Sequence, residues 1–238
     1  EIGVPAGVAY REEGKARAGM GVDPADIDGT GVQSLVVTNF QNEMMGLYKL
    51  SGKGAFSDVA PGSEIGRVTR RSLGFGCFFF DPDLDGFLDV LVANGHMDAG
   101  RNIEHAQSPH LFLNRRGVFR DVATGEFATP KVGRGAAYGD FDNDGDQDVL
   151  ITTNGGSAHL YRTDVTSGNR SLRLRLVGTA SNRDAIGAVV RLTAGDLKAA
   201  RTVKSGGSYL SQSELPLTFG LGRRATADLI VVHWPNGR

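Results

Sequence analysis

Short apolar runs alternate with polar, turn-forming stretches along the chain. The clearest case is SLRLRLV at 171–177, where apolar side chains occupy every second position, as in a half-buried β-strand. Three β-branched runs, LVVTNF, VLVANG and VLITTNG, begin at Leu35, Val90 and Val149. Together with the 34 glycines, which favour tight turns, this pattern predicts an all-β fold of short strands.

The three β-branched runs belong to an internal repeat. Each follows an acidic loop, at residues 26–34, 81–89 and 140–148, and the first aspartates of successive loops are 55 and 59 residues apart. After each run comes an apolar-aromatic pair: Leu47-Tyr48, Leu111-Phe112 and Leu160-Tyr161. Two units close with the related phrases GAFSDVA and GVFRDVA. Each unit therefore predicts four short strands, which is the make-up of a propeller blade.

This combination resembles the FG-GAP/VCBS repeats of integrin α-type propellers and of many secreted bacterial proteins, over residues 18–165. The resemblance implies a β-propeller. Because a closed ring typically needs about four to eight blades, we expect residues 1–166 to form a partial propeller of about three blades, truncated at both ends.

The acidic loops have the composition of a calcium (Ca2+) site. Calcium takes six to eight oxygens, and a loop can supply side chains at positions 1, 3, 5 and 9 and a backbone carbonyl at position 7, while glycine at position 6 permits a positive φ. The ligands expected in the second loop are Asp81, Asp83, Asp85, the carbonyl of Phe87, and Asp89. Those expected in the third are Asp140, Asp142, Asp144, the carbonyl of Asp146, and Asp148, with the Asp146 carboxylate facing outward.

Two other interpretations of these loops are weaker. An EF-hand needs a glutamate at position 12, where this chain has Val37, Val92 and Ile151. A metal-free acidic turn would leave four ordered carboxylates close together, and like charges at short range repel strongly. We therefore expect a cation in the second and third loops.

The first loop carries less charge. Its corresponding ligands would be Asp26, Asp28, Thr30, the carbonyl of Val32, and Ser34. Calcium affinity falls with the charge of the ligand set, so the sequence leaves open whether this loop binds a metal. Asp23 could assist, although its register does not match the loop.

Residues 167–238 form a second predicted unit, without an acidic loop. Further strand-like runs at 188–194, 200–204 and 227–234 favour a small β-sandwich-like module. The phrases NRDAIGAVVRLTAG, SGGSYLSQSELPLTFGLG and VHWPNG look like the ASPIC/UnbV domain, which follows a VCBS propeller in cartilage acidic protein-like sequences. The resemblance implies an ASPIC/UnbV domain truncated at its C-terminus.

Charge divides the chain at the same place. Residues 169–238 carry 11 Lys and Arg against 4 Asp and Glu, a net +7, which leaves 15 against 23, or -8, for residues 1–168. The basic residues alternate along strands instead of clustering, so we expect a solvated sheet face and no nucleic-acid partner. No apolar run reaches the roughly 18 residues of a membrane-spanning helix. Cys77, the one cysteine, lies in GFGCFFF and is expected in the core.

These features predict a calcium-binding, non-enzymatic interaction protein that is secreted, periplasmic or at the cell surface, with a protein or glycan partner. The alternative is a carbohydrate-binding or accessory module of a secreted polysaccharide-acting system. Ser208, in GGSYL, lacks the final glycine of a nucleophile elbow, and the histidines lack zinc-ligand spacing. A catalytic metal needs an open coordination position, which loops this rich in ligands would not leave.

Overall fold

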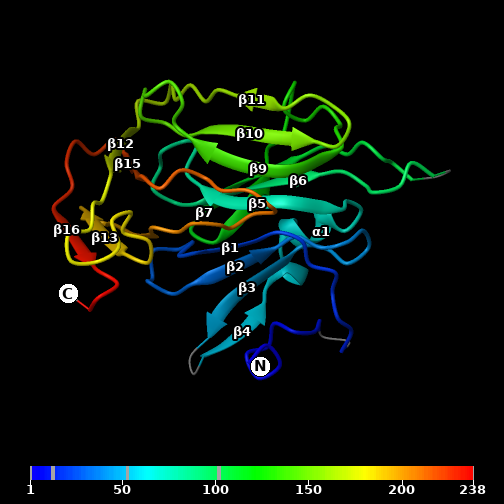
Figure 1. Ribbon diagram of the computed structural model, residues 1–238, viewed down its shortest axis with the longest axis horizontal. Helices are drawn as coiled ribbons and strands as arrows, with labels where there is room; N and C mark the ends of the chain where they lie inside the picture. The colour runs from blue at the N-terminus through cyan, green and yellow to red at the C-terminus, as the bar shows by residue number, and fades with distance from the viewer. Residues whose placement is uncertain (1, 12–13, 52–53, 101–102, 238) are drawn as a thin grey trace.

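The computed structural model, which describes residues 2–11, 14–51, 54–100 and 103–237, is built on antiparallel sheets (Figure 1). The first sheet has the strand order β1-β2-β3-β4, formed by β1 (Val22–Ala25), β2 (Ser34–Val37), β3 (Gly46–Ser51) and β4 (Ala55–Asp58). The second has the order β5-β6-β7-β8, formed by β5 (Gly74–Phe80), β6 (Asp89–Asn94), β7 (His110–Arg115) and β8 (Val118–Asp121). The 3-10 turn η2 (Ala60–Gly62) and helix α1 (Glu64–Thr69) join these sheets.

The third sheet consists of β9 (Gly133–Gly139), β10 (Asp148–Thr153) and β11 (His159–Tyr161), in the order β11-β10-β9. All three sheets are meanders of the kind found in propeller blades, so the all-β prediction is confirmed. The prediction of four strands per unit is wrong for this third blade in the part of the chain that the structure describes. After β11 the backbone amides of Thr163 and Val165 donate to the carboxylates of Asp148 and Asp146, so the chain follows the acidic loop instead of adding a strand.

The blades pack face to face through β5, whose sequence GFGCFFF is buried throughout. Side chains alternate between the two faces of a strand. Cys77 and Phe79 accordingly join the core shared with the first blade, whereas Phe78 and Phe80 join the core shared with the third. The prediction that Cys77 is a core residue is confirmed, and its burial raises the pKa of the thiol.

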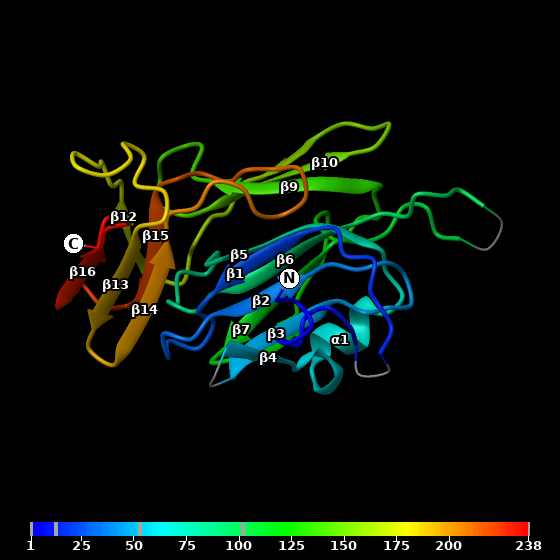
Figure 2. The ribbon, with the colours of Figure 1, turned by 60° about the horizontal axis from the view of Figure 1, so that its bottom comes forward.

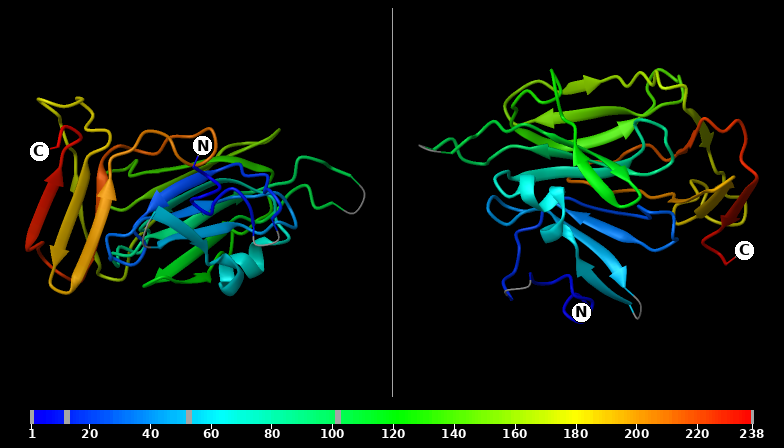
Figure 3. Two further views of the ribbon diagram at one scale, coloured as in Figure 1. Left: turned by 90° about the horizontal axis from the view of Figure 1, so that it is seen from below. Right: turned by 180° about the vertical axis from the view of Figure 1, so that it is seen from behind.

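Two small sheets form the C-terminal module. In one, β12 (Arg170–Leu174) pairs with β15 (Leu217–Gly222); in the other, β13 (Val189–Ala194) lies between β14 (Leu197–Thr202) and β16 (Leu229–His233). Buried side chains such as Val190, Leu192 and Phe219 fill the space between the sheets. In Figure 2, strands β13 to β16 stand across one end of the blade strands. Figure 3 shows the same arrangement from below and from behind.

Residues 203–216, which we call the crossing segment, leave the module and run back between the blades (orange in Figure 1). Ser208 lies at the centre of this segment. Its backbone exchanges hydrogen bonds with Val22 of β1, at 2.9 and 3.4 Å. Its hydroxyl accepts from the Cys77 amide of β5 at 3.1 Å and donates to the Ala136 carbonyl of β9 at 2.8 Å. One residue therefore contacts the first strand of every blade.

Within the described ranges, the structure has no helix long and apolar enough to cross a membrane.

Candidate metal centre

The three acidic loops share one backbone conformation. In each, the carboxylate at position 1 accepts a hydrogen bond from the amide at position 6, over distances of 2.8, 3.0 and 3.1 Å. The position 6 residues Gly31, Gly86 and Gly145 have φ values of 78°, 101° and 99°, as the calcium-loop pattern predicts. Position 4 is also left-handed, with φ of 72° at Gly29, 55° at Leu84 and 61° at Asn143. Leucine seldom adopts this conformation, so the sequence did not indicate it.

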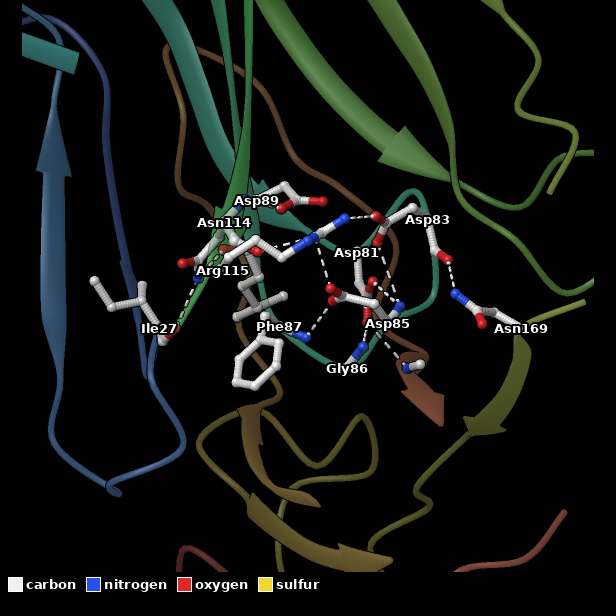
Figure 4. Close-up of polar contacts among 12 residues, drawn as sticks. Ile27, Asp81, Asp83, Asp85, Gly86, Phe87, Asp89, Asn114, Arg115 and Asn169 are labelled. Atoms are coloured by element: carbon white, nitrogen blue, oxygen red, sulfur yellow. Dashed lines mark hydrogen bonds and ion pairs between the residues drawn. The ribbon is translucent and has the colours of Figure 1, made fainter. Parts of the chain in front are cut away.

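The second loop brings its aspartates together (Figure 4). Oxygens of Asp81, Asp83 and Asp89 lie within 4.8 Å of one another. Oδ1 of Asp89 accepts the Asn114 amide at 2.6 Å, whereas its Oδ2 is buried and has no hydrogen-bond partner. Buried polar atoms are nearly always paired, so an unpaired carboxylate oxygen close to two further carboxylates indicates a position for a cation.

Burial and mutual repulsion also shift the pKa values of this loop. Desolvation raises the pKa of Asp81 to about 7 and that of Asp89 to about 9, and the neighbouring aspartates add to both shifts. Arg115 is the closest cation, at 2.9 Å from Asp83 and 2.6 Å from Asp85. Its side chain is 56% exposed, and its single charge cannot neutralise four carboxylates.

The third loop repeats this arrangement, and both oxygens of its position 9 aspartate accept hydrogen bonds. Oxygens of Asp140, Asp142 and Asp148 lie within 4.8 Å of one another. Asp148 accepts the Thr163 amide at 2.8 Å through Oδ1 and the Phe141 amide at 3.0 Å through Oδ2. Thr163 thus plays the same part in the third blade as Asn114 in the second. Both loops tie their position 9 aspartate to the third strand of the blade, or to the residues directly after it.

The prediction that the Asp146 carboxylate faces outward is wrong. Asp146 is 5% exposed, its Oδ2 accepts the Val165 amide at 3.1 Å, and its Oδ1 is buried without a hydrogen-bond partner. The segment that follows β11 covers it. Burial, together with the charges of Asp144 and Asp148, raises its pKa to about 6. The third loop therefore holds one more buried carboxylate than the sequence indicated.

In the first loop an ammonium group stands among the acidic side chains. Lys49 of β3 lies directly opposite Ser34 in the β2–β3 register and forms an ion pair with Asp28. Although partial burial raises the pKa of Asp28, the hydrogen bonds from Lys49 and Thr30 and the charge of Lys49 together lower it overall. Lys49 follows Tyr48 as Leu113 follows Phe112 in the second blade. Aligning the repeats in this way could have revealed Lys49 from the sequence.

Asp23, which the sequence left open as an additional ligand of the first loop, does not assist it. It is buried in β1, accepts the Phe79 amide at 2.9 Å and forms an ion pair with Lys204 of the crossing segment. Desolvation raises its pKa, while Lys204 acts in the opposite direction. Its role is to join the module to the first blade.

A serine, a histidine and an aspartate are aligned at the end of the second blade away from its acidic loop. His110 bonds Asp121 at 2.7 Å through Nδ1 and Ser72 at 3.3 Å through Nε2. The first blade has an aspartate at the same place, Asp58, which pairs with Arg17 at 2.8 Å. Each aspartate also accepts the amide two residues further on. Because the repeat reproduces the aspartate with a different partner, we interpret this alignment as a blade-closing contact.

Comparison with known families agrees with this architecture. A model described as FG-GAP-like repeat matches residues 81–151, from the first aspartate of the second loop to the strand after the third. A model described as ASPIC and UnbV matches residues 178–238. The chain combines an FG-GAP-like repeat with an ASPIC and UnbV domain. The family resemblance predicted from the sequence motifs is thereby confirmed.

Two curated relatives are similar to this FG-GAP and ASPIC/UnbV chain. Cartilage acidic protein 1 of Xenopus tropicalis is 28% identical over 137 residues, which is 58% of this chain and 20% of the relative. Cartilage acidic protein 1 of Mus musculus is 26% identical over 174 residues, which is 73% of this chain and 24% of the relative. The chain thus spans a fifth to a quarter of the length of these relatives.

Proposed function

We propose that this chain is a calcium-binding, non-enzymatic part of a secreted, periplasmic or cell-surface interaction protein, in which ions in the second and third loops clamp the blades. The observation that carries the proposal is the unpaired, buried Oδ2 of Asp89, close to Asp81 and Asp83. The name of both relatives refers to cartilage, a tissue made largely of extracellular matrix, which supports the proposed location.

The donor set fits calcium better than other common metals. It offers only oxygens, which suit hard cations, and no thiolate or imidazole of the kind that zinc or copper prefers. In the second loop Asp81, Asp83, Asp85, the carbonyl of Phe87, and Asp89 would hold the ion. A bound calcium supplies two positive charges that remove the repulsion. Asp81 directly follows β5, Asp89 begins β6, and the other oxygen of Asp89 holds the Asn114 amide of β7. The ion would therefore stabilise the pairing of these three strands.

For the first loop we propose that Lys49 takes the place of the metal. The ammonium already neutralises Asp28, and only Asp26 remains as a second charged ligand. Binding a divalent cation would require moving Lys49 away from Asp28. Only the carboxylates of Asp26 and Asp28 would then neutralise the charge of the cation. The expected stoichiometry is therefore two calcium ions for each chain.

The direct test is isothermal titration calorimetry of the chelator-treated chain. We expect two calcium ions to bind, with magnesium much weaker because it demands a smaller, octahedral shell. Asp142→Asn, which removes a position 3 carboxylate of the third loop, should reduce the stoichiometry to one tight ion. If the wild-type chain takes up no calcium, the proposed function is wrong.

Calcium binding should also release protons. Without metal, at pH 7, Asp89 with a pKa of about 9 keeps its proton and Asp81 with a pKa of about 7 is half protonated. Calcium binds the ionised carboxylates, so we expect about one to two protons to leave the second loop and the affinity to rise as pH increases towards 9. Calorimetry at pH 7 in two buffers of different ionisation enthalpy measures the number released. Equal heats in both buffers would contradict this prediction.

The carbohydrate-binding alternative receives no comparable support. Trp234, the side chain best suited to stack on a sugar, packs against the core of the C-terminal module. A glycan array on the calcium-loaded chain separates the two functions, because specific glycan binding would favour the alternative.

A further inference from the structure

The three acidic loops all lie against the C-terminal module. At Gly29 of the first loop a Cβ atom would lie 2.5 Å from the Lys198 carbonyl of the module. In the third loop Asp140 forms an ion pair with Arg173 of β12. The contact with the second loop is the most extensive, and it uses both backbone and side-chain atoms.

Four groups of the second loop bond to the module or to the residue before it. The Gly220 amide donates to Oδ2 of Asp81 at 3.2 Å, and the Gly222 amide donates to the Leu84 carbonyl at 2.9 Å. Asn169 donates to the Asp83 carbonyl at 2.8 Å (Figure 4). Arg201 donates to the Gly86 carbonyl at 3.3 Å. A Cβ on Gly220 would lie 2.3 Å from Oδ2 of Asp81, so β15 approaches the loop too closely for any side chain.

Charge explains why the two parts attract each other. The module and the residue before it carry +7 and the remainder of the chain carries -8. Arg173, Arg201 and Lys204 all reach carboxylates outside the module. The expectation of a solvated basic sheet face is therefore wrong for these three side chains. Three of the 11 basic residues in 169–238 thus serve an internal contact.

We propose that the C-terminal module docks on the second acidic loop and that calcium in this loop strengthens the docking. The inference rests on the proposed calcium binding. Three of the four contacts above go to loop carbonyls, which carry no charge and do not compete with the ion. A cation held by the aspartate side chains fixes the turn that presents those carbonyls. Linkage then requires that docking raises calcium affinity by the same factor.

Arg201 opposes this coupling through one contact only, its ion pair with Asp81. It lies 4.0 Å from Asp81, so an ion on Asp81 reduces that attraction. Arg201 keeps its bonds to the Gly86 and Ala200 carbonyls and its position over the Phe219 ring, at 5.3 Å from the centroid. The partners that hold its guanidinium in the interface are therefore independent of the charge of Asp81.

Hydrogen exchange of the whole chain tests the proposal. The Gly220 and Gly222 amides donate to the loop, so calcium should slow exchange in residues 217–222 by about fivefold or more. Residues 229–233 of β16, an edge strand of the other module sheet, should change little and report any general stabilisation. In Asp89→Asn, calcium should no longer protect 217–222.

Because docking should in turn strengthen calcium binding, calcium affinity gives a second measurement. Asn169→Ala removes one bond to the back of the loop and should weaken calcium binding there by about fivefold. Asn182→Ala is the matched control, because among the described residues the Asn182 side chain bonds within its own turn, to Ile186. If calorimetry shows calcium bound at the second loop but exchange of 217–222 and the Asn169→Ala affinity are unchanged, the docking inference is wrong and the calcium function stands. Absence of calcium binding would instead overturn the function itself.

Discussion

Asp89→Asn should be more stable than the wild-type chain in EDTA and less stable than it in calcium. Without metal, the wild-type fold buries Asp89 with its pKa raised to about 9, above the unfolded value. At pH 7 the unfolded chain is thus ionised at this position while the fold holds a proton, and the difference favours unfolding. Asparagine carries no charge and removes this cost, which is on the order of 4 kcal/mol for the roughly three units between the unfolded pKa and pH 7.

Calcium reverses the order of stability. An ion present at about 10,000 times its dissociation constant stabilises a fold by about 5.5 kcal/mol, or about 11–22 °C of melting temperature for a chain of this size. The wild-type chain should gain this from the second and third loops, whereas Asp89→Asn should gain from the third alone. Differential scanning calorimetry of both proteins, with calcium and with EDTA, measures all four values.

Asp184→Asn is the control for this experiment, because it makes the same change at an exposed position of the module. It should follow the wild-type chain in both buffers. If Asp89→Asn gains as much stability from calcium as the wild-type chain does, the second loop does not bind the ion through Asp89.

Restoring the missing carboxylates of the first loop and removing its ammonium should create a third calcium site. The variant Thr30→Asp, Ser34→Asp, Lys49→Leu gives this loop the ligand pattern of the second, with leucine at the place of Leu113. Its backbone is already suited, because Asp26 accepts the Gly31 amide as Asp81 accepts that of Gly86. Calorimetry should show three ions instead of two.

The double variant Thr30→Asp, Ser34→Asp, with Lys49 retained, isolates the role of the ammonium. We expect its third ion to bind at least about tenfold more weakly, because the ion must displace a charge within hydrogen-bonding distance of Asp28. Equal affinity in the double and triple variants would show that Lys49 does not substitute for the metal.

Local repetition made the loops and the strand content predictable. Aspartates recur three times at alternate positions before a β-branched run, and this pattern indicates a loop followed by a strand. The conformation that the three loops share at position 6 confirms the prediction of the loops. Partners distant in sequence were not predictable. Asp146 is buried by a segment after β11, and Arg173 reaches Asp140 across 33 residues. The local sequence pattern does not indicate contacts of this kind. The position of Lys49 opposite Ser34 could have been predicted from the repeat. This prediction requires aligning the third strand of the first blade with the third strand of the second.

The crossing segment has a consequence for the order in which this chain can fold. Ser208 bonds to β1, β5 and β9, and Lys204 pairs with Asp23 across 181 residues. On the ribosome, all the blade strands emerge before the segment that binds their inner edges. Contacts of such long sequence separation form slowly. Until they form, the strand edges remain exposed and are prone to aggregation. Nascent chains should therefore depend on chaperones until residue 216 has been released, and early termination before the crossing segment should yield insoluble protein.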